Sequence, residues 1–584
     1  MRKLVYKKKS ITRKRNFLIF LSILLIAGLV VFNNRNKIFN KKEYIADNQK
    51  EIINNGTKSK DNLQDLSSLD QEGHKAVTDA KAEKYAVVSS NPVASQVAMQ
   101  VLKDGGNAVD AAVALSFALN VTDPQNSGIG GGGGMMVYDT KTNKKVFYDY
   151  YIQSGDTQPV NNIGIPGFLK GMEQISNDLG TIDFSKLLDY PIALAEKGVI
   201  VTKEYSNILN SYNYISQVYP AVNRADGTIL QEGDVFKQPD LISTLKAIKE
   251  SGSDVFYGGQ HKISRDFLNL TGISQEALAN YKVRVTEPLE ATYRGYKILA
   301  PKGPFSGLTV LQNLILEEKI NIPEKNSKSE DYNNKIKSLY KFTAREGRKY
   351  ISHDNTIDYA SLLDSDSLYQ NYHAYDGNES YYVEPESEST TAFSVIDKDG
   401  MIVSGTNTIS NFWGSYKIQN GIIYNNAMKN FSHAPNDFAF NKRPKTGISP
   451  LIITGVDGYI ESLGSNGGAQ IPTYLTQYLM NTKKYSMLPQ DANDFERTYY
   501  LKGLMHFELN APIYTFEKEE DINYKGNYKV KKSSYGWGVM DGLVFTRDGR
   551  IIPHNDKRNY FYGGGAYVNG DLVYPDPNSS QIKK

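Results

Sequence analysis

Two strand-like segments joined by a short polar turn constrain the fold more than any other part of the chain. They occupy residues 390–396 (TTAFSVI) and 401–410 (MIVSGTNTIS), and the four residues 397–400 (DKDG) connect them. Apolar and β-branched runs on either side of an Asp/Gly turn are typical of a β-hairpin. The protein core must therefore contain at least one sheet that includes this hairpin.

A pair of threonines, Thr390 and Thr391, begins the hairpin directly after the acidic, serine-rich run 385–389 (PESES). Threonine is common at the start of a strand, so the pair can be purely structural. Alternatively, the chain is cut before Thr390. The hydroxyl of an amino-terminal threonine is a nucleophile, and its own α-amine, with a pKa of about 7.7 to 8.0, can accept the proton. Such a junction needs an accessible segment before the threonine and a rigid strand after it.

Helical patterns precede the hairpin. Valines recur at every fourth position from Val93 to Val101, until Gly105 and Gly106 end the pattern. A second helix is predicted over 108–119, and because it is apolar on nearly every face, we expect it to be buried. Residues 135–324 then mix hairpins with amphipathic helices, and several short strands follow the hairpin, which predicts an α/β body whose sheets are covered by helices.

Five consecutive glycines, residues 130–134, lie in front of the strand-like run MMVYDT. A phosphate-binding loop would need a Lys-Ser/Thr pair and a following helix, and neither is present. Close approach of backbone segments explains the glycines better. The region 325–389 is expected to be rich in loops.

The amino terminus predicts export. The first sixteen residues hold eight basic residues and no acidic residue, residues 17–32 (FLIFLSILLIAGLVVF) are uncharged and apolar, and residues 33–80 form a polar stalk. Basic residues before an apolar segment favour a cytoplasmic amino end and an exported body. The segment 17–32 is then a membrane anchor or a cleaved signal peptide, and the body lies on the extracellular face of the membrane.

Composition excludes several kinds of site. The chain has a formal net charge of +3, so without its basic first segment the body is mildly acidic, which argues against nucleic acid as a partner. It contains no cysteine, which rules out disulfides and thiolate chemistry, and its seven histidines are scattered. We therefore expect no metal and no cofactor.

The chain resembles the γ-glutamyltranspeptidases, which are N-terminal-nucleophile hydrolases. The resemblance rests on a series of segments in order: 91–114, 123–137, 164–173, 293–307, 390–415, 422–432, 443–450 and 463–470. It implies a four-layer αββα sandwich built jointly by two parts of one self-cleaved chain. The bond after Ser389 would be cut, which gives a large part, 81–389, and a small catalytic part, 390–584.

The resemblance also implies roles for particular residues. Thr390 would be the nucleophile, and Thr408 would place a second hydroxyl beside it. Gly467 and Gly468 correspond to a glycine pair whose backbone N–H groups form an oxyanion hole, the donors that stabilise negative charge in the tetrahedral state. Thr446 retains one of two substrate-facing hydroxyls of the family, whereas Gly447 has lost the other.

Departures from the family pattern concern the substrate. Tyr151 stands where glutathione-cleaving members have an arginine that binds the α-carboxylate of the substrate, and Ser410, Ala427 and Asn430 stand where they have Asn, Gln and Asp. The absent aspartate would hold a free α-ammonium group. Internal units of poly-γ-glutamate have amide α-nitrogens, so they need no such partner.

The pattern is therefore similar to that of capsule-type enzymes, which cut poly-γ-glutamate and transfer it to a cell-wall amine. Arg558 and Arg443 are candidates for binding the α-carboxylate in place of Tyr151. Two other functions stay open: a broad glutathione or γ-glutamyl peptide hydrolase, and an inactive surface protein that only binds polymer.

Overall fold

The structure is a computed structural model of the chain. It describes residues 85–323, 330–350, 357–375, 389–495, 497–501, 504–508, 538–546, 550–556, 558, 565–569 and 571–573. The predicted basic segment, apolar segment and stalk, residues 1–80, lie outside this range. Within the described residues, no helix has the length and hydrophobicity needed to cross a membrane.

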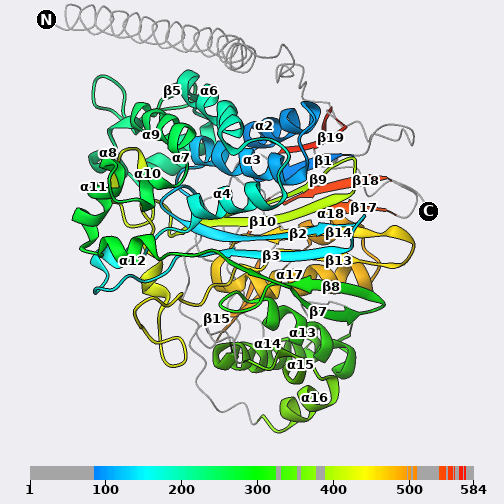
Figure 1. Cartoon of the computed structure of the whole chain (residues 1–584). Helices are drawn as coiled ribbons and strands as arrows, with labels where there is room; N and C mark the ends of the chain where they lie inside the picture. The colour runs from blue at the N-terminus through cyan, green and yellow to red at the C-terminus, as the bar shows by residue number, and fades with distance from the viewer. Residues whose placement is uncertain are drawn as a thin grey trace, which may run out of the picture.

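Two antiparallel sheets lie face to face in the middle of the molecule (Figure 1). The first has the order β20-β19-β1-β9-β10-β2-β3-β6 and the second has the order β18-β17-β14-β13-β8-β7. The strands of the first sheet are, in that order, Asp571–Val573, Gly565–Val568, Ala86–Ser89, Ser389–Ile396, Met401–Ser410, Gly132–Asp139, Lys144–Tyr150 and Arg284–Thr286. Those of the second are Ile551–Asn555, Met540–Phe545, Ile460–Ser465, Leu451–Thr454, Tyr296–Ala300 and Leu289–Tyr293.

Helices cover the outer face of each sheet (Figure 1). The first sheet packs against α2 (Pro92–Lys103), α3 (Ala108–Thr122), α4 (Phe168–Leu179), α6 (Asp189–Lys197) and α9 (Pro239–Ser251). The second packs against α13 (Gly307–Ile320), α14 (Glu330–Tyr350) and α17 (Ile471–Leu479). The predicted four-layer αββα sandwich is therefore confirmed.

Shorter elements complete the described chain. The helices are α5 (Phe184–Leu187), α7 (Lys203–Ser211), α8 (Ile215–Val218), α10 (Asp254–Tyr257), α11 (Lys262–Thr271), α12 (Gln275–Ala279), α15 (Tyr359–Leu362), α16 (Ser365–His373) and α18 (Pro489–Asp494). The strand pairs are β4 (Val199–Ile200) with β5 (Val235–Phe236), β11 (Ile418–Gln419) with β12 (Ile422–Ile423), and β15 (Arg497–Leu501) with β16 (Leu504–Glu508).

The buried helix α3 is tied to the predicted hairpin. Every residue of α3 is buried, as its uniformly apolar sequence predicts, and a capping box between Asn107 and Asp110 begins the helix. The N–H of Ala108 donates a 2.9 Å hydrogen bond to a carboxylate oxygen of Asp397, which lies in the turn between β9 and β10. The first turn of α3 therefore fixes the far end of the hairpin.

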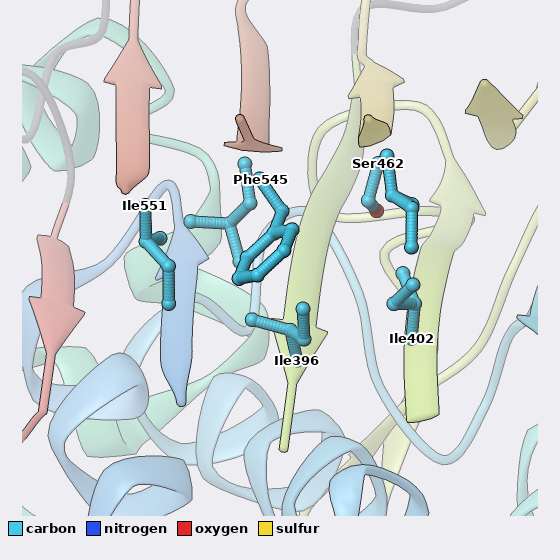
Figure 2. A pocket seen from close by; sticks show the side chains of 7 residues that line it. Ile396, Ile402, Ser462, Phe545 and Ile551 are labelled. Carbon is cyan, nitrogen blue, oxygen red and sulfur yellow. The ribbon is translucent and has the colours of Figure 1, made fainter. Parts of the chain in front are cut away.

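The inner faces of the two sheets form an apolar layer with a small cavity (Figure 2). Ile396 of β9, Ile402 of β10 and Phe545 of β17 are among its lining residues, and its volume is about 10 Å³. A space of this size holds about one water molecule at most. The lining is apolar except for Ser462, whose hydroxyl already donates to Ser394 (Figure 2). This cavity is a packing gap in the core, too small for a substrate.

The prediction that region 325–389 is rich in loops is wrong for much of its length. Residues 330–350 form α14, and α15 and α16 lie within 357–375. Tyr332, Ile336 and Leu339 of α14 are buried in the core against the second sheet. Their spacing of three to four residues is helical, but the many lysines and asparagines around them hide the pattern. Residues 376–388 lie outside the described residues.

A buried chain of polar groups on the outer side of the second sheet links β14, β18 and α17. Tyr478 donates a 2.6 Å hydrogen bond to Glu461, whose carboxylate also pairs with Lys483 at 2.6 Å. His554 Nε2 lies 3.0 Å from the same tyrosine oxygen, and its Nδ1 lies 3.1 Å from the amide nitrogen of Asn493. The imidazole is therefore neutral with its proton on Nε2, and burial lowers the pKa of His554 to about 4.

We expect His554 to make the folded protein acid-sensitive. Because its pKa falls from 6.5 in the unfolded chain to about 4 in the fold, the unfolded state binds the proton more tightly. Stability is fully present above pH 6.5 and is lost as the pH falls toward 4, by up to about 3 kcal/mol. Chemical denaturation at several pH values should show a flatter decline for His554→Gln, whereas the exposed control His433→Gln should follow the unmodified protein. An equally steep decline for His554→Gln would contradict this assignment.

Candidate active site

A β-bulge marks the point where the candidate residues meet. Strand β10 pairs with β9 in regular register up to Asn407 opposite Thr391, and the next pair is Ser410 opposite Ser389. Thr408 and Ile409 therefore lie opposite the single residue Thr390, which is the geometry of a bulge. Ser410 has a φ of 81°, a left-handed conformation that non-glycine residues seldom adopt.

Two hydroxyl groups meet one peptide carbonyl at the bulge. Thr390 Oγ1 lies 2.6 Å from the carbonyl oxygen of Ser389 and 3.3 Å from Thr408 Oγ1. Thr408 Oγ1 donates a short hydrogen bond to the same Ser389 oxygen, and it accepts a 2.9 Å hydrogen bond from the N–H of Ser410. Donors on a carbonyl oxygen stabilise the negative charge that develops when a nucleophile attacks its carbon.

The peptide bond between Ser389 and Thr390 is buried. The two residues are 0 % and 4 % exposed, and Ser389 Oγ donates hydrogen bonds of 3.1 and 3.0 Å to the carbonyls of Gln125 and Asn126. The expectation of an accessible segment directly before the threonine therefore fails at Ser389, which is the first residue of β9. In the folded chain, a bond buried in this way is out of reach of another protease.

The two threonines of the pair face opposite sides of the first sheet. Thr391 points toward the helices and donates a 2.7 Å hydrogen bond to Asp123, the residue that ends α3. Asp123 also accepts hydrogen bonds of 2.5 and 2.8 Å from the side chains of Gln125 and Asn126. Thr391 is therefore a structural residue, and Thr390, one position earlier, faces the second sheet.

Strands β9 and β14 of the two sheets contact each other at every second residue along β9 toward Thr390. Ser462 of β14 donates a 2.6 Å hydrogen bond to Ser394, and a β-carbon at Gly464 would lie 2.8 Å from that of Ala392. Two residues further along, the next facing positions are Asn466, which directly follows β14, and Thr390 in β9. The glycine pair that follows Asn466 therefore lies at the Thr390 end of the hairpin.

Gly467 and Gly468 both have positive φ values, 121° and 60°, which favour glycine. Among the described residues, neither N–H donates a hydrogen bond to another protein group. The loop with Thr446 and Gly447 packs directly on this pair, because a β-carbon at Gly447 would lie only 2.0 Å from the Gly468 carbonyl oxygen. Thr446 itself is 4 % exposed. The structure thus brings these predicted residues into one neighbourhood.

Asn430 and Tyr151, two residues that differ from the family pattern, contact each other. The side-chain amide of Asn430 lies 3.4 Å from the hydroxyl of Tyr151. Tyr151 is 1 % exposed and packs against the ring of Phe305, with 5.7 Å between the ring centroids. A neutral amide and a neutral phenol therefore meet here, where glutathione-cleaving members would place an aspartate and an arginine.

Both candidate arginines are held by internal carboxylates. Arg443 is buried and pairs with Asp149 at 2.6 Å, and Arg284 donates to the same carboxylate at 2.8 Å. Burial opposes ionisation of Asp149, but the two guanidinium groups hold its pKa below the usual value. Arg558 is 6 % exposed and pairs with Asp556 at 2.7 Å. These contacts give both arginines structural roles, so we assign neither to the α-carboxylate of a substrate.

Comparison with known proteins decides the family. The family model described as gamma-glutamyltranspeptidase matches residues 94–560. The chain belongs to the γ-glutamyltranspeptidase family. It is 33% identical over 488 residues to the capsule biosynthesis protein CapD proenzyme of Bacillus anthracis, across 81% of this chain and 89% of that protein.

Other members of the family and its fold are also similar. The chain is 31% identical over 538 residues to the glutathione hydrolase proenzyme of Bacillus subtilis (strain 168), across 81% of this chain and 92% of that protein. The crystal structure of cephalosporin acylase from Bacillus halodurans superposes with a TM-score of 0.71 and 22% identity, over 86% of this chain and 98% of that one. This last likeness supports the N-terminal-nucleophile fold alone.

Proposed function

We propose that this γ-glutamyltranspeptidase cuts its own chain after Ser389 and then uses Thr390 to transfer or hydrolyse γ-glutamyl groups of poly-γ-glutamate. The observation that carries the proposal is the Ser389 carbonyl, which receives the hydroxyls of both Thr390 and Thr408 in a buried bulge. In this proposal the Thr390 hydroxyl attacks the carbonyl carbon, and the Thr408 hydroxyl stabilises the oxygen of the attacked carbonyl.

Self-cleavage proceeds in two balanced steps. Thr390 Oγ1 attacks the Ser389 carbonyl carbon, the C–N bond to Thr390 breaks, and the hydroxyl proton moves to the released nitrogen. Water then hydrolyses the resulting ester, which leaves a carboxylate on Ser389 and restores the Thr390 hydroxyl. The products are the parts 81–389, with any retained amino-terminal segment, and 390–584, and Thr390 now carries a free α-amine.

Turnover uses the same hydroxyl with a new base. The α-amine of Thr390 accepts the hydroxyl proton as the oxygen attacks a γ-glutamyl carbonyl, and the N–H groups of Gly467 and Gly468 stabilise the tetrahedral oxygen. The proton passes to the leaving amine, and a glutamyl ester remains on Thr390. Water or a cell-wall amine then takes the acyl group, and neither a metal nor a cofactor takes part.

The neutral contact between Tyr151 and Asn430 supports poly-γ-glutamate as the substrate. Both side chains are neutral, so neither can form an ion pair with the free α-carboxylate or α-ammonium of a small γ-glutamyl donor. Internal units of the polymer carry no α-ammonium, and neighbouring units provide further contacts. Ser410 and Thr446 are expected to contact the bound glutamyl unit. The likeness to a capsule biosynthesis protein agrees with this substrate.

Residues 17–32 are proposed to hold the enzyme at the extracellular face of the membrane, where a capsule polymer and cell-wall amines are available. If they are instead a cleaved signal, the same body is secreted. A broad γ-glutamyl hydrolase is the second candidate, because the chain is also 31% identical to a glutathione hydrolase. An inactive polymer-binding protein is disfavoured by the paired hydroxyls at Ser389.

We predict that Thr390→Ala stays a single chain, because alanine has no hydroxyl to attack the Ser389 carbonyl. Thr390→Ser should still be cut, more slowly, since its hydroxyl lacks the β-branch that restricts rotation. A denaturing gel gives the number of chains, and amino-terminal sequencing of the small part should begin at Thr390. Cleavage of Thr390→Ala at the same bond would exclude Thr390 as the nucleophile.

Thr408→Ala should slow both self-cleavage and turnover by about 10² to 10⁴-fold, the range of a positioned proton-handling group. The matched variant Thr408→Ser keeps the hydroxyl that donates to Ser389 and should retain most of both rates. Cleavage can be followed by gel over time, and turnover with a chromogenic γ-glutamyl donor. Unchanged rates in Thr408→Ala would reduce this threonine to a structural strand residue.

The mature enzyme is predicted to prefer internal bonds of poly-γ-glutamate to glutathione. Losing two charge-assisted contacts costs a small donor roughly 1.5 to 3 kcal/mol each. Asn430→Asp should improve turnover of donors with a free α-amine and weaken polymer cleavage, whereas Asn430→Gln, which stays neutral, should not improve the small donors. The values of kcat/KM for both substrates test this, and glutathione cleavage at least as efficient as polymer cleavage in the unmodified enzyme would favour the broad hydrolase.

A further inference from the structure

The turn that follows α3, residues 123–127, contacts the residue before the bond between Ser389 and Thr390. The Ser389 hydroxyl shares its proton between the carbonyl oxygens of Gln125 and Asn126, at 3.1 and 3.0 Å. Both of these residues are at most 2 % exposed. The Ser389 side chain is therefore held against a buried part of the protein and not against solvent.

The same turn contacts the residue after that bond. The Thr391 hydroxyl donates a 2.7 Å hydrogen bond to the carboxylate of Asp123, the first residue of the turn. Side chains alternate along β9, so Ser389 and Thr391 both face the turn, and Thr390 faces the second sheet. The peptide group between Ser389 and Thr390 can rotate out of its present orientation only if one of these contacts breaks.

The turn also holds the strand end that carries Thr408. The carbonyl of Asn126 accepts a 3.1 Å hydrogen bond from the N–H of Ile409, the residue that follows Thr408. The carbonyl of Gln125 accepts a 3.0 Å hydrogen bond from the N–H of Trp413. Because a carbonyl oxygen can accept two hydrogen bonds, each of these two groups joins the segment after Thr408 to the start of β9.

Asp123 sets the shape of the turn. One oxygen of its carboxylate accepts hydrogen bonds of 2.5 and 2.8 Å from the side-chain amides of Gln125 and Asn126, and the other accepts the hydrogen bond from Thr391. The carbonyl of Asp123 accepts a 3.0 Å hydrogen bond from the N–H of Asn126. Hydrogen bonds to a carboxylate are stronger than those between neutral groups, so Asp123 fixes the two carbonyl groups relative to β9.

We propose that residues 123–127 form a clamp that positions the Ser389 carbonyl for attack by Thr390, with the Ser389 hydroxyl and Asp123 as its positioning groups. The inference rests on the proposed function. The attack closes a ring through the backbone of Thr390, so it requires one orientation of the peptide group, and a misplacement of about 1 Å can cost about 100-fold in rate. The clamp keeps the carbonyl oxygen where the hydroxyls of Thr390 and Thr408 meet it.

The test follows self-cleavage of the newly synthesised full chain over time on a denaturing gel. We expect Ser389→Ala to be cut about 10- to 100-fold more slowly than the unmodified chain, because it lacks the hydroxyl that holds the bond. Ser389→Thr keeps a hydroxyl and should be cut faster than Ser389→Ala. If this buried position required only a small side chain, the order would be reversed, because alanine fits the space and threonine adds a methyl group.

Ser404→Ala is the matched control. The Ser404 hydroxyl donates a 3.0 Å hydrogen bond to the carbonyl of Leu463, so this variant also loses one buried hydrogen bond from a serine to the backbone. Ser404 makes no contact with the clamp among the hydrogen bonds of the described residues, and Ser404→Ala should be cut at the unmodified rate. In the uncut Thr390→Ala background, Ser389→Ala and Ser404→Ala should unfold at similar denaturant concentrations.

Asp123→Asn tests the other positioning group. It keeps the size of the side chain but replaces the carboxylate by a neutral amide, and it should also slow self-cleavage about 10- to 100-fold. Since both changes disturb one clamp, the variant that combines Ser389→Ala with Asp123→Asn should lose less than the product of the two single losses. Losses that multiply would show two independent effects and would contradict a single clamp.

The remaining outcomes separate the clamp from the proposed function. If the unmodified chain were never cut after Ser389, self-cleavage itself would fail, and the clamp with it. If the unmodified chain is cut, three results overturn the clamp alone: an unchanged rate in Ser389→Ala, slower cutting of Ser389→Thr than of Ser389→Ala, or an equal loss in Ser404→Ala.

Discussion

The bulge that sets Thr408 and Ile409 opposite Thr390 is the constraint on which the rest of the site depends. The register that pairs Asn407 with Thr391 places Thr408 directly opposite Thr390, so the two threonine side chains share one face of the sheet. Ile409 is then the extra residue before Ser410 pairs with Ser389, and the Thr408 hydroxyl donates to the Ser389 carbonyl. Self-cleavage and turnover are both proposed to follow from this pairing at the start of the bulge.

The glycine run beside the hairpin makes this arrangement possible. A β-carbon at Gly131 would lie 2.2 Å from the carbonyl oxygen of Thr408, and one at Gly133 would lie 2.2 Å from that of Thr406. Only residues without a side chain let this segment approach β10 so closely. The expectation that these glycines serve close packing is confirmed.

Cutting the chain after Ser389 would not separate the two parts. Both sheets contain strands from before and after this bond: β1 pairs with β9 and β19 in the first sheet, and β13 pairs with β8 in the second. Most of these backbone hydrogen bonds are buried between helix layers. The predicted parts therefore share one core, and the new amino terminus of Thr390 stays beside the glycine pair of the second sheet.

Local patterns in the sequence were sufficient to predict the hairpin, the buried helix α3 and the layered fold. They could not predict the burial of Ser389 or the role of Asp123, because both arise from contacts between segments more than 250 residues apart. The same limit applies to Arg443 and Arg558, whose carboxylate partners are set by tertiary pairing and turn geometry.

Mass spectrometry of the acyl-enzyme would test the central claim most directly. The mature protein is mixed briefly with a γ-glutamyl donor, quenched in acid and digested. The account predicts an acid-stable, alkali-labile γ-glutamyl ester on the hydroxyl of the peptide that begins at Thr390. A γ-glutamyl adduct on any other residue, or donor cleavage by a chain that is still intact between Ser389 and Thr390, would contradict it.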